Sequence, residues 1–281
     1  MSELTLDCLQ ELKIKIKETQ AIADLANDIL SKPDIGAVSS TLESAPLRRS
    51  TANAMTKSAL VLLCGYFEGF LKNIIEEFAI TLNDNKLPLN SMSDYILLSL
   101  VEASIQGDKI KTIKNLQKIK DGIIKSEHIP FDHKQINGTK GNPTVDTVES
   151  IFNKIGISDV IDQLSIRDFA VDSTYTRTTQ LDKGFLKKIN DALNNDTNSS
   201  TQIIEIIESK WGPKKQRRAV GYVGVIQELL KTRNRIAHGE NFGEQVTPGD
   251  LTDYSNHVEK LCEGLHDLIV TELVMYGVPP S

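Results

Sequence analysis

The fold is decided by the stretch Leu60-Val-Leu-Leu-Cys-Gly-Tyr-Phe-Glu-Gly-Phe-Leu-Lys-Asn-Ile-Ile-Glu-Glu-Phe78. Its large apolar side chains recur every three or four residues, the spacing of one face of an α-helix: Leu60, Leu63, Phe67, Phe70, Leu71, Ile74 and Phe78. We therefore expect residues 52–82 to form one long amphipathic helix. Gly65 and Gly69 interrupt it, each at a cost of about 1 kcal/mol of helix propensity, so we expect close helix packing or a ligand beside them.

The rest of the chain has the same helical period on both sides of this stretch. Apolar residues three or four apart predict further helices over residues 4–30, 93–106, 108–125, 144–164 (one or two short helices) and 201–210. Residues 126–142 contain Gly and Pro and are predicted to be a loop. The polar segment 165–200 is predicted to be an irregular excursion with a weak helix near 181–193. The chain is thus predicted to be all-α.

Two more helices are expected near the C-terminus, over about residues 215–239 and 249–275. Thr247-Pro-Gly-Asp250 predicts the start of the second, with Thr as N-cap, Pro in the first turn and an acid three residues after the cap. Beyond it, apolar residues three and four apart form a stripe: Leu251, Tyr254, Val258, Leu261, Leu265 and Leu268. This stripe predicts a packing seam, either inside the chain or at a dimer interface.

Composition restricts the function. Aromatic residues are only 5% of the 281 residues, and the net charge is −6. The low aromatic content argues against a base-stacking platform for single strands, and the acidic balance means that any nucleic-acid site must be a local basic patch. We expect one elaborated domain, residues 1–281, in which residues 85–210 form a partly irregular insertion between the core helices.

The cysteines and the apolar runs indicate the compartment. Cys8, Cys64 and Cys262 are scattered, odd in number and without a Cys-x-x-Cys pair, which argues against a disulfide framework and a structural zinc. The longest apolar run, residues 59–67, is shorter than the roughly 20 residues that span a bilayer, and the first residues lack a signal-type stretch. We expect a cytoplasmic protein without a membrane partner.

The most informative segment for function is Leu229-Leu-Lys-Thr-Arg-Asn-Arg-Ile-Ala-His-Gly239. Successive helical residues are about 100° apart, which places Arg233 on the apolar face, where a guanidinium needs a carboxylate, a phosphate or several carbonyls as partners. His238 falls on the polar edge, four residues after Asn234, which can hydrogen-bond the ring and orient it. Gly239 can end the helix, so His238 is expected on an exposed last turn.

Two segments resemble the HEPN superfamily. Arg233-Asn-Arg-Ile-Ala-His238 resembles its Arg-(four to six residues)-His signature. Tyr66-Phe-Glu-Gly-Phe-Leu-Lys72 resembles the group called RiboL-PSP-HEPN and its relatives in bacterial toxin and defence loci. The resemblance covers roughly residues 52–82 and 215–275.

The resemblance implies a four-helix core, a symmetric homodimer and cleavage of RNA at the cleft between the subunits. It makes Arg233 and His238 the catalytic pair, gives Asn234 an assisting role and matches Glu68 to an acidic residue near the motif in some members. It implies a toxin or antiviral effector that needs no metal and no cofactor, with a regulatory or antitoxin protein as a further partner. Some HEPN toxins carry a modified Tyr two residues after the motif His; Glu240 stands there in this chain, which argues against that control.

The implied chemistry is consistent with these side chains. RNA carries its own nucleophile, the 2′-OH, so no metal-bound water is needed. One imidazole can accept the 2′-OH proton while a second protonates the 5′ leaving oxygen. Because one chain offers one motif histidine, two chains related by a two-fold axis would supply both. Arg233 would neutralise the charge that builds on the phosphoryl oxygens, and the products would be a 2′,3′-cyclic phosphate and a 5′-OH.

Structural interpretations stand beside these functional ones. The domain could be a non-catalytic helical module for dimerisation or for binding a partner protein. His238 could then favour the helix dipole, Arg233 could pair with Glu68, and Glu68 could pair with Lys72 four residues on. Basic residues around the motif helix could hold an RNA backbone or be a solvated helix start: Lys214, Lys215, Arg217, Arg218, Lys231 and Arg235. The lysines within residues 109–125 are read as a solvated face, with RNA contact as the alternative.

Overall fold

The computed structural model describes residues 7–31, 44–105, 109–130, 142–175, 191, 193, 217–238 and 245–278. Its named elements in these ranges are all helices: α1 (Cys8–Ser31), α2 (Ala45–Asp84), η1 (Leu89–Ser91), α3 (Asp94–Ile105), α4 (Lys109–Lys125), α5 (Val145–Lys154), α6 (Val160–Phe169), α9 (Tyr222–His238) and α10 (Pro248–Met275). The described residues contain no strand, only an isolated antiparallel bridge between Tyr175 and Arg217. The prediction of an all-α fold is confirmed.

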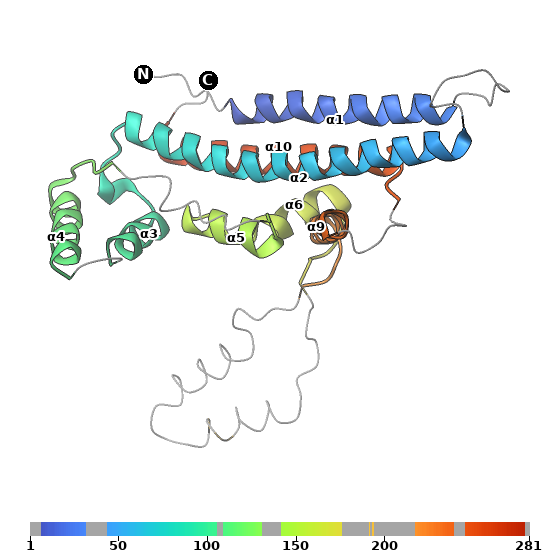
Figure 1. Ribbon diagram of the computed structural model, residues 1–281. Coiled ribbons are helices and arrows are strands. Elements are labelled where there is room, and N and C mark those ends of the chain that lie inside the picture. The colour runs from blue at the N-terminus through green and yellow to red at the C-terminus, as the bar shows by residue number, and fades with distance from the viewer. Residues whose placement is uncertain are drawn as a thin grey trace.

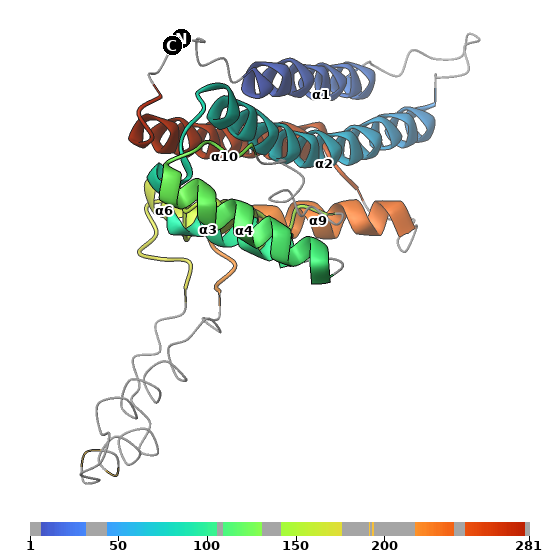
Figure 2. The ribbon, with the colours of Figure 1, turned by 90° about the vertical axis from the view of Figure 1, so that its left-hand side faces the viewer.

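The helices form layers around α2. α1 lies along one side of α2 and α10, while α5, α6 and α9 lie on the other side (Figure 1). α9 is seen end-on where α2 runs across the view, and runs across the view after a quarter turn, so it crosses α2 steeply (Figures 1 and 2). α3 and α4 pack together beyond one end of this stack. The crossing brings the end of α9 beside the middle of α2.

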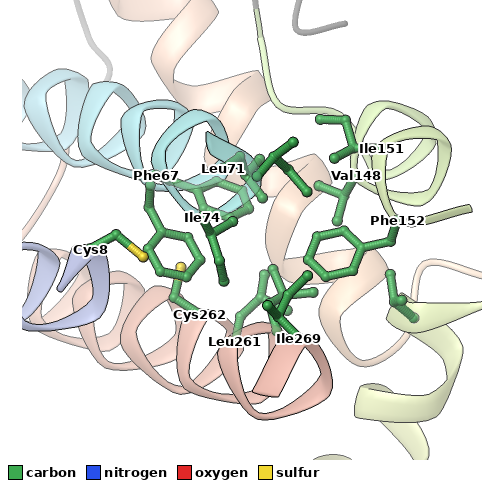
Figure 3. Close-up of a cluster of buried hydrophobic side chains, with 14 of the residues drawn as sticks. Cys8, Phe67, Leu71, Ile74, Val148, Ile151, Phe152, Leu261, Cys262 and Ile269 are labelled. Atoms are coloured by element: carbon green, nitrogen blue, oxygen red, sulfur yellow. The ribbon is translucent and has the colours of Figure 1, made fainter. Parts of the chain in front are cut away.

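The hydrophobic core joins segments that are far apart in the sequence (Figure 3). Side chains from α1, α2, α5 and α10 meet in it, among them Cys8, Phe67, Leu71, Ile74, Val148, Phe152, Leu261 and Ile269. Phe67 and Phe152 are both fully buried. The α5–α6 part of the segment expected to be an insertion therefore belongs to the packed core, while α3 and α4 lie at its edge.

The long amphipathic helix is confirmed as α2, although it begins at Ala45 rather than near residue 52, with Pro46 in its first turn. α2 is also long and apolar enough to cross a membrane, but half of that window is buried inside the protein, as in a core helix. A Cβ placed on Gly65 or Gly69 would meet no atom of the described residues within 4 Å. The close helix packing expected there is therefore not formed by this part of the chain.

The start of the last helix is as predicted. Thr247 Oγ1 accepts the amide proton of Asp250 at 3.0 Å, and the Asp250 carboxylate accepts that of Thr247 at 2.9 Å, a reciprocal capping box. The apolar stripe of α10 packs inside the chain: Leu251, Val258, Leu261 and Leu265 are buried, and Tyr254 and Leu268 pack against the same core. Of the two alternatives for this seam, the structure selects the intramolecular one.

α9 begins at Tyr222, later than the predicted start near residue 215. Gly221 has a left-handed backbone with φ of +57°, which an α-helix cannot contain. Ser165 Oγ on α6 accepts the amide proton of Tyr222 at 3.0 Å and so caps the helix from outside. The helices expected near 181–193 and over 201–210 lie outside the described residues, apart from residues 191 and 193.

Candidate active site at the end of α9

The last turns of α9 carry the three motif residues. His238 is the final residue of α9 and is exposed, as expected. Arg233 and Asn234 lie one turn earlier and are partly buried. The helix thus presents an accessible imidazole directly beyond a guanidinium that is half withdrawn from solvent.

Arg233 lies against the middle of α2. Burial raises the pKa of the Cys64 thiol on α2 to about 12, and the nearby positive charge of Arg233 opposes that rise. The Arg233 Nη1 group donates to Asn234 Oδ1 at 3.1 Å. Among the described residues, no carboxylate forms an ion pair with Arg233. Its positive charge is therefore held in a partly desolvated place without a neutralising partner from these parts of the chain.

Asn234 holds the guanidinium rather than the imidazole. Its Oδ1 accepts both from Arg233 Nη1, at 3.1 Å, and from Asn142 Nδ2, at 3.3 Å. The sequence suggested a hydrogen bond from Asn234 to His238, and no such bond occurs in the described structure. Asn142 precedes α5 and lies 92 positions before Asn234, so no local pattern could have indicated this contact.

Glu68 has the local partner that its position allows. Lys72 Nζ lies 2.6 Å from Glu68 Oε1, an i,i+4 ion pair on α2. The described structure has no ion pair between Glu68 and Arg233, so that alternative is not formed. Glu68 nevertheless lies on α2 one turn beyond Cys64, whose thiol is influenced by the charge of Arg233.

A groove runs along the polar side of α9. It has a volume of about 1060 Å³, and α9 lines it with Gln227, Lys231, Asn234 and Arg235. The opposite wall comes from α5 and the residues around it, including Asp146, Glu149, Asn153, Asp159, Tyr175 and Arg217. Three of the basic residues suggested for RNA binding therefore line this groove: Lys231 and Arg235 beside Asn234, and Arg217 on the opposite wall.

Arg217 is held in a partly buried network instead of projecting into solvent. Its Nη1 lies 3.1 Å from Glu149 Oε1, its Nη2 donates to Tyr175 Oη at 2.7 Å, and its guanidinium lies 4.7 Å from the centre of the Tyr175 ring. Glu149 also accepts the amide protons of Val160 and Ile161 at the start of α6. Burial raises the pKa of Glu149, against the opposing charge of Arg217 and the bond from Ile161.

Of the remaining basic residues suggested for RNA binding, the structure describes Arg218. Arg218 donates to the Ser173 carbonyl through Nη2, and its own amide proton goes to the Thr174 carbonyl at 2.7 Å. Arg218 therefore joins the chain beside Arg217 to residues 173 and 174. Lys214 and Lys215 lie outside the described residues.

None of the other described histidines belongs to α9. His128 Nδ1 is 2.9 Å from the Leu87 carbonyl oxygen, and His257 on α10 stacks on Phe169. His266 lies half-buried on α10, where burial lowers its pKa. Among the described residues, no group of three or more His, Cys, Asp or Glu side chains is arranged to hold a metal ion.

Comparisons with known proteins agree with the motif and the fold. A model of the RiboL-PSP-HEPN family matches residues 15–271 of the chain. No curated protein and no solved structure matches it. The match spans nearly all the described helices, including α3 to α6. On this coverage, the chain belongs to the RiboL-PSP-HEPN family.

Proposed function

We propose that this protein is an endoribonuclease that needs no metal and works as a homodimer, with Arg233 and His238 of both subunits at a shared active site. The carrying observation is the state of the motif: His238 is exposed at the end of α9, and Arg233 one turn behind it has no ion-pair partner among the described residues. A purely structural motif would be expected to be covered or neutralised within its own chain. HEPN domains are often ribonucleases, which supports the same proposal.

The reaction follows from these two side chains and from RNA itself. In one subunit, the neutral His238 imidazole takes the proton of the 2′-OH, whose oxygen bonds to phosphorus. The bond from phosphorus to the 5′ oxygen breaks, and the protonated His238 of the second subunit supplies a proton to that oxygen. Arg233 stabilises the charge on the phosphoryl oxygens. The products are a 2′,3′-cyclic phosphate and a 5′-OH, and no water is consumed.

Asn234 has a supporting part in this proposal. Its amide oxygen, which also accepts from Asn142, fixes the Arg233 guanidinium in place. A fixed donor stabilises a transition state better than one that must be oriented during the reaction. Glu68 could contact the substrate or Arg233 only if its ion pair with Lys72 were broken. We therefore assign Glu68 a modest effect on the electrostatic potential of the site rather than a direct role in the reaction.

The biological role that we propose is that of a toxin or antiviral effector. A ribonuclease with no metal requirement is active wherever it folds and dimerises, so a cell that makes it needs to restrain it. A regulatory or antitoxin protein that covers the dimer cleft is the simplest such restraint.

The test is cleavage of end-labelled single-stranded RNA and tRNA in EDTA. We expect the wild-type protein to leave 2′,3′-cyclic phosphate ends and both His238→Ala and Arg233→Ala to lose at least a hundredfold in rate. His257→Ala is the matched control, because it removes a partly buried histidine on α10 that stacks on Phe169 and, in the described structure, makes no hydrogen bond or ion pair with Arg233, Asn234 or His238. Equal background cleavage by all four folded proteins would overturn the enzymatic proposal and favour a non-catalytic module.

A further inference from the structure

The groove beside α9 leads from the motif into the body of the protein. Gln227, Lys231, Asn234 and His238 follow one another at intervals of four, three and four residues, so they lie along one side of α9. The first three line the groove, and His238 follows one turn beyond them. A chain bound with a phosphate at His238 can therefore place its neighbouring nucleotide in this groove.

The size of the groove suits a nucleotide. Pockets for small organic ligands measure roughly 300–1,000 Å³, and this groove encloses about 1060 Å³. The volume is therefore large enough for a nucleotide. Glu149, Tyr175 and Arg217 are bound to one another in the wall opposite α9, where the Arg217 guanidinium lies over the Tyr175 ring.

Apart from Arg217, which is paired with Glu149, the cations of the groove lie on α9 and the carboxylates lie on the α5 side. On α9, Lys231 is exposed and Arg235 is partly buried. On the α5 side there are three carboxylates, of which two have structural partners: Glu149 binds Arg217, and Asp159 accepts from Tyr175 Oη. Asp146 in the first turn of α5 is exposed, and it has no hydrogen-bond or ion-pair partner within the described parts of the chain. Asn153, also exposed, lies two turns further along α5.

We propose that this groove is the base-recognition subsite of the enzyme and that Asp146 makes it selective for guanine. The inference rests on the proposed ribonuclease function for its biological meaning, although not for its test. Lys231 binds the backbone phosphate of the nucleotide, and the base lies between α9 and α5. Its edge faces Asp146, and the Gln227 and Asn153 amides supply a further donor and acceptor each.

Guanine follows from the chemistry of a lone carboxylate. A carboxylate accepts hydrogen bonds and cannot donate them. Guanine presents two adjacent donors on its Watson–Crick edge, N1–H and the 2-amino group, which match the two carboxylate oxygens. Uracil presents carbonyl oxygens on both sides of its single N3–H, and these are repelled by the negative charge. A matched bidentate pair typically contributes roughly a tenfold or greater preference over the wrong base.

Asp146 could also have a structural role, and the test must separate that role from recognition of guanine. An acidic residue in the first turn of a helix also favours the helix dipole. Asp94 is also an acidic residue in the first turn of a helix, α3; it is exposed and does not line the groove. Asp94→Asn is therefore a matched control that removes the same helix-terminal charge elsewhere.

The test is binding of guanosine 3′-monophosphate and uridine 3′-monophosphate to the full-length protein by calorimetry, because mononucleotides contain no bond for the enzyme to cleave. We expect wild type and Asp94→Asn to prefer the guanosine nucleotide by roughly tenfold or more. Asp146→Asn should reduce the preference below about twofold, and Lys231→Ala should weaken both nucleotides by a similar factor.

Equal affinity for the two nucleotides in the wild type, or a guanine preference that survives Asp146→Asn, would overturn this inference. Neither result depends on catalysis. A protein that cleaves RNA without guanine selectivity would retain the proposed function and lose the subsite. A protein with the guanine preference but without cleavage would retain the subsite and lose the nuclease.

Discussion

At the scale of single residues, Asn234 connects the Arg233 guanidinium of the motif to the rest of the protein. Its side-chain oxygen receives hydrogen bonds from Arg233 on its own helix and from Asn142 ahead of α5. Arg233 in turn lies close enough to Cys64 to influence the thiol, so the guanidinium is placed between α2 and Asn234. In the described structure, no residue donates a hydrogen bond to the His238 ring or accepts one from it. This is consistent with an active site that is completed by a second subunit.

A substitution at Asn234 tests this positioning role. We expect Asn234→Ala to lower the maximal cleavage rate roughly tenfold while changing the Michaelis constant little, because a misplaced guanidinium weakens transition-state stabilisation more than substrate binding. Asn234→Asp keeps the accepting oxygen and should recover part of the rate. Steady-state kinetics with a short RNA measures both. A large rise in the Michaelis constant alone would instead indicate that Asn234 mainly binds substrate.

At the scale of elements, the position of α9 is set by α6. Ser165 Oγ on α6 accepts the Tyr222 amide proton and so caps α9. The side chain of the same tyrosine also binds α6, because Tyr222 Oη donates to Asp168 at 2.6 Å. Gly221 provides the sharp entry, and a Cβ there would lie 2.6 Å from Ser165 Cβ. The three contacts fix the start of the helix whose end carries the motif.

The entry to α9 therefore should not tolerate a side chain. We expect Gly221→Ala to lower the free energy of unfolding by about 2 kcal/mol or more, because it combines a left-handed backbone with a steric clash. Urea denaturation monitored by circular dichroism measures the loss. Gly65→Ala is the control, since the described residues leave open space there and alanine favours the helix by up to about 1 kcal/mol. Equal stability of Gly221→Ala and wild type would contradict this description of the α6–α9 contact.

Asp168 gives the same contact a pH dependence. The hydrogen bond from Arg167 is the main cause that holds the pKa of Asp168 below its usual 3.8, with the Tyr222 hydroxyl adding to it and burial opposing it. A lowered pKa in the folded state means that ionised Asp168 stabilises the fold above its unfolded pKa, and that this contribution is lost as the pH falls through and below about 4.

We therefore expect wild type to exceed Asp168→Asn in Tm at neutral pH, and the difference to shrink between about pH 5 and about pH 3. Differential scanning calorimetry across that range measures it. A difference that stays constant down to about pH 3 would show that Asp168 acts through its shape rather than its charge.

At the scale of the whole molecule, the sequence predicts the features that depend on neighbouring residues and misses those that depend on contacts between distant segments. The α2 face and the Thr247–Asp250 cap follow from spacing and were predicted correctly, because each depends on neighbours within a turn or two. The start of α9 was predicted too early, since its cap comes from Ser165 on another helix.

The candidate site shows the same difference between local features and tertiary contacts. The motif predicted an exposed His238 and a withdrawn Arg233, and the structure places both accordingly. The groove could not be predicted, because its walls join α5, α9, Tyr175 and Arg217 across gaps of many residues. Arg217 was suggested as an RNA contact on charge alone; its pairing with Glu149 depends on a tertiary contact 68 positions away. Assembly of two subunits lies at a further level, beyond a single folded chain.

That assembly is the central claim, and subunit mixing tests it most directly. Wild-type and His238→Ala proteins are unfolded together, refolded in varying ratios and assayed for RNA cleavage in EDTA at constant total protein. If each active site needs the histidines of both subunits, activity falls with the square of the wild-type fraction, to about one quarter at equal amounts, because random pairing leaves one dimer in four intact. A linear fall to about one half would contradict the shared site, and an absence of cleavage by the wild type itself would contradict the enzyme.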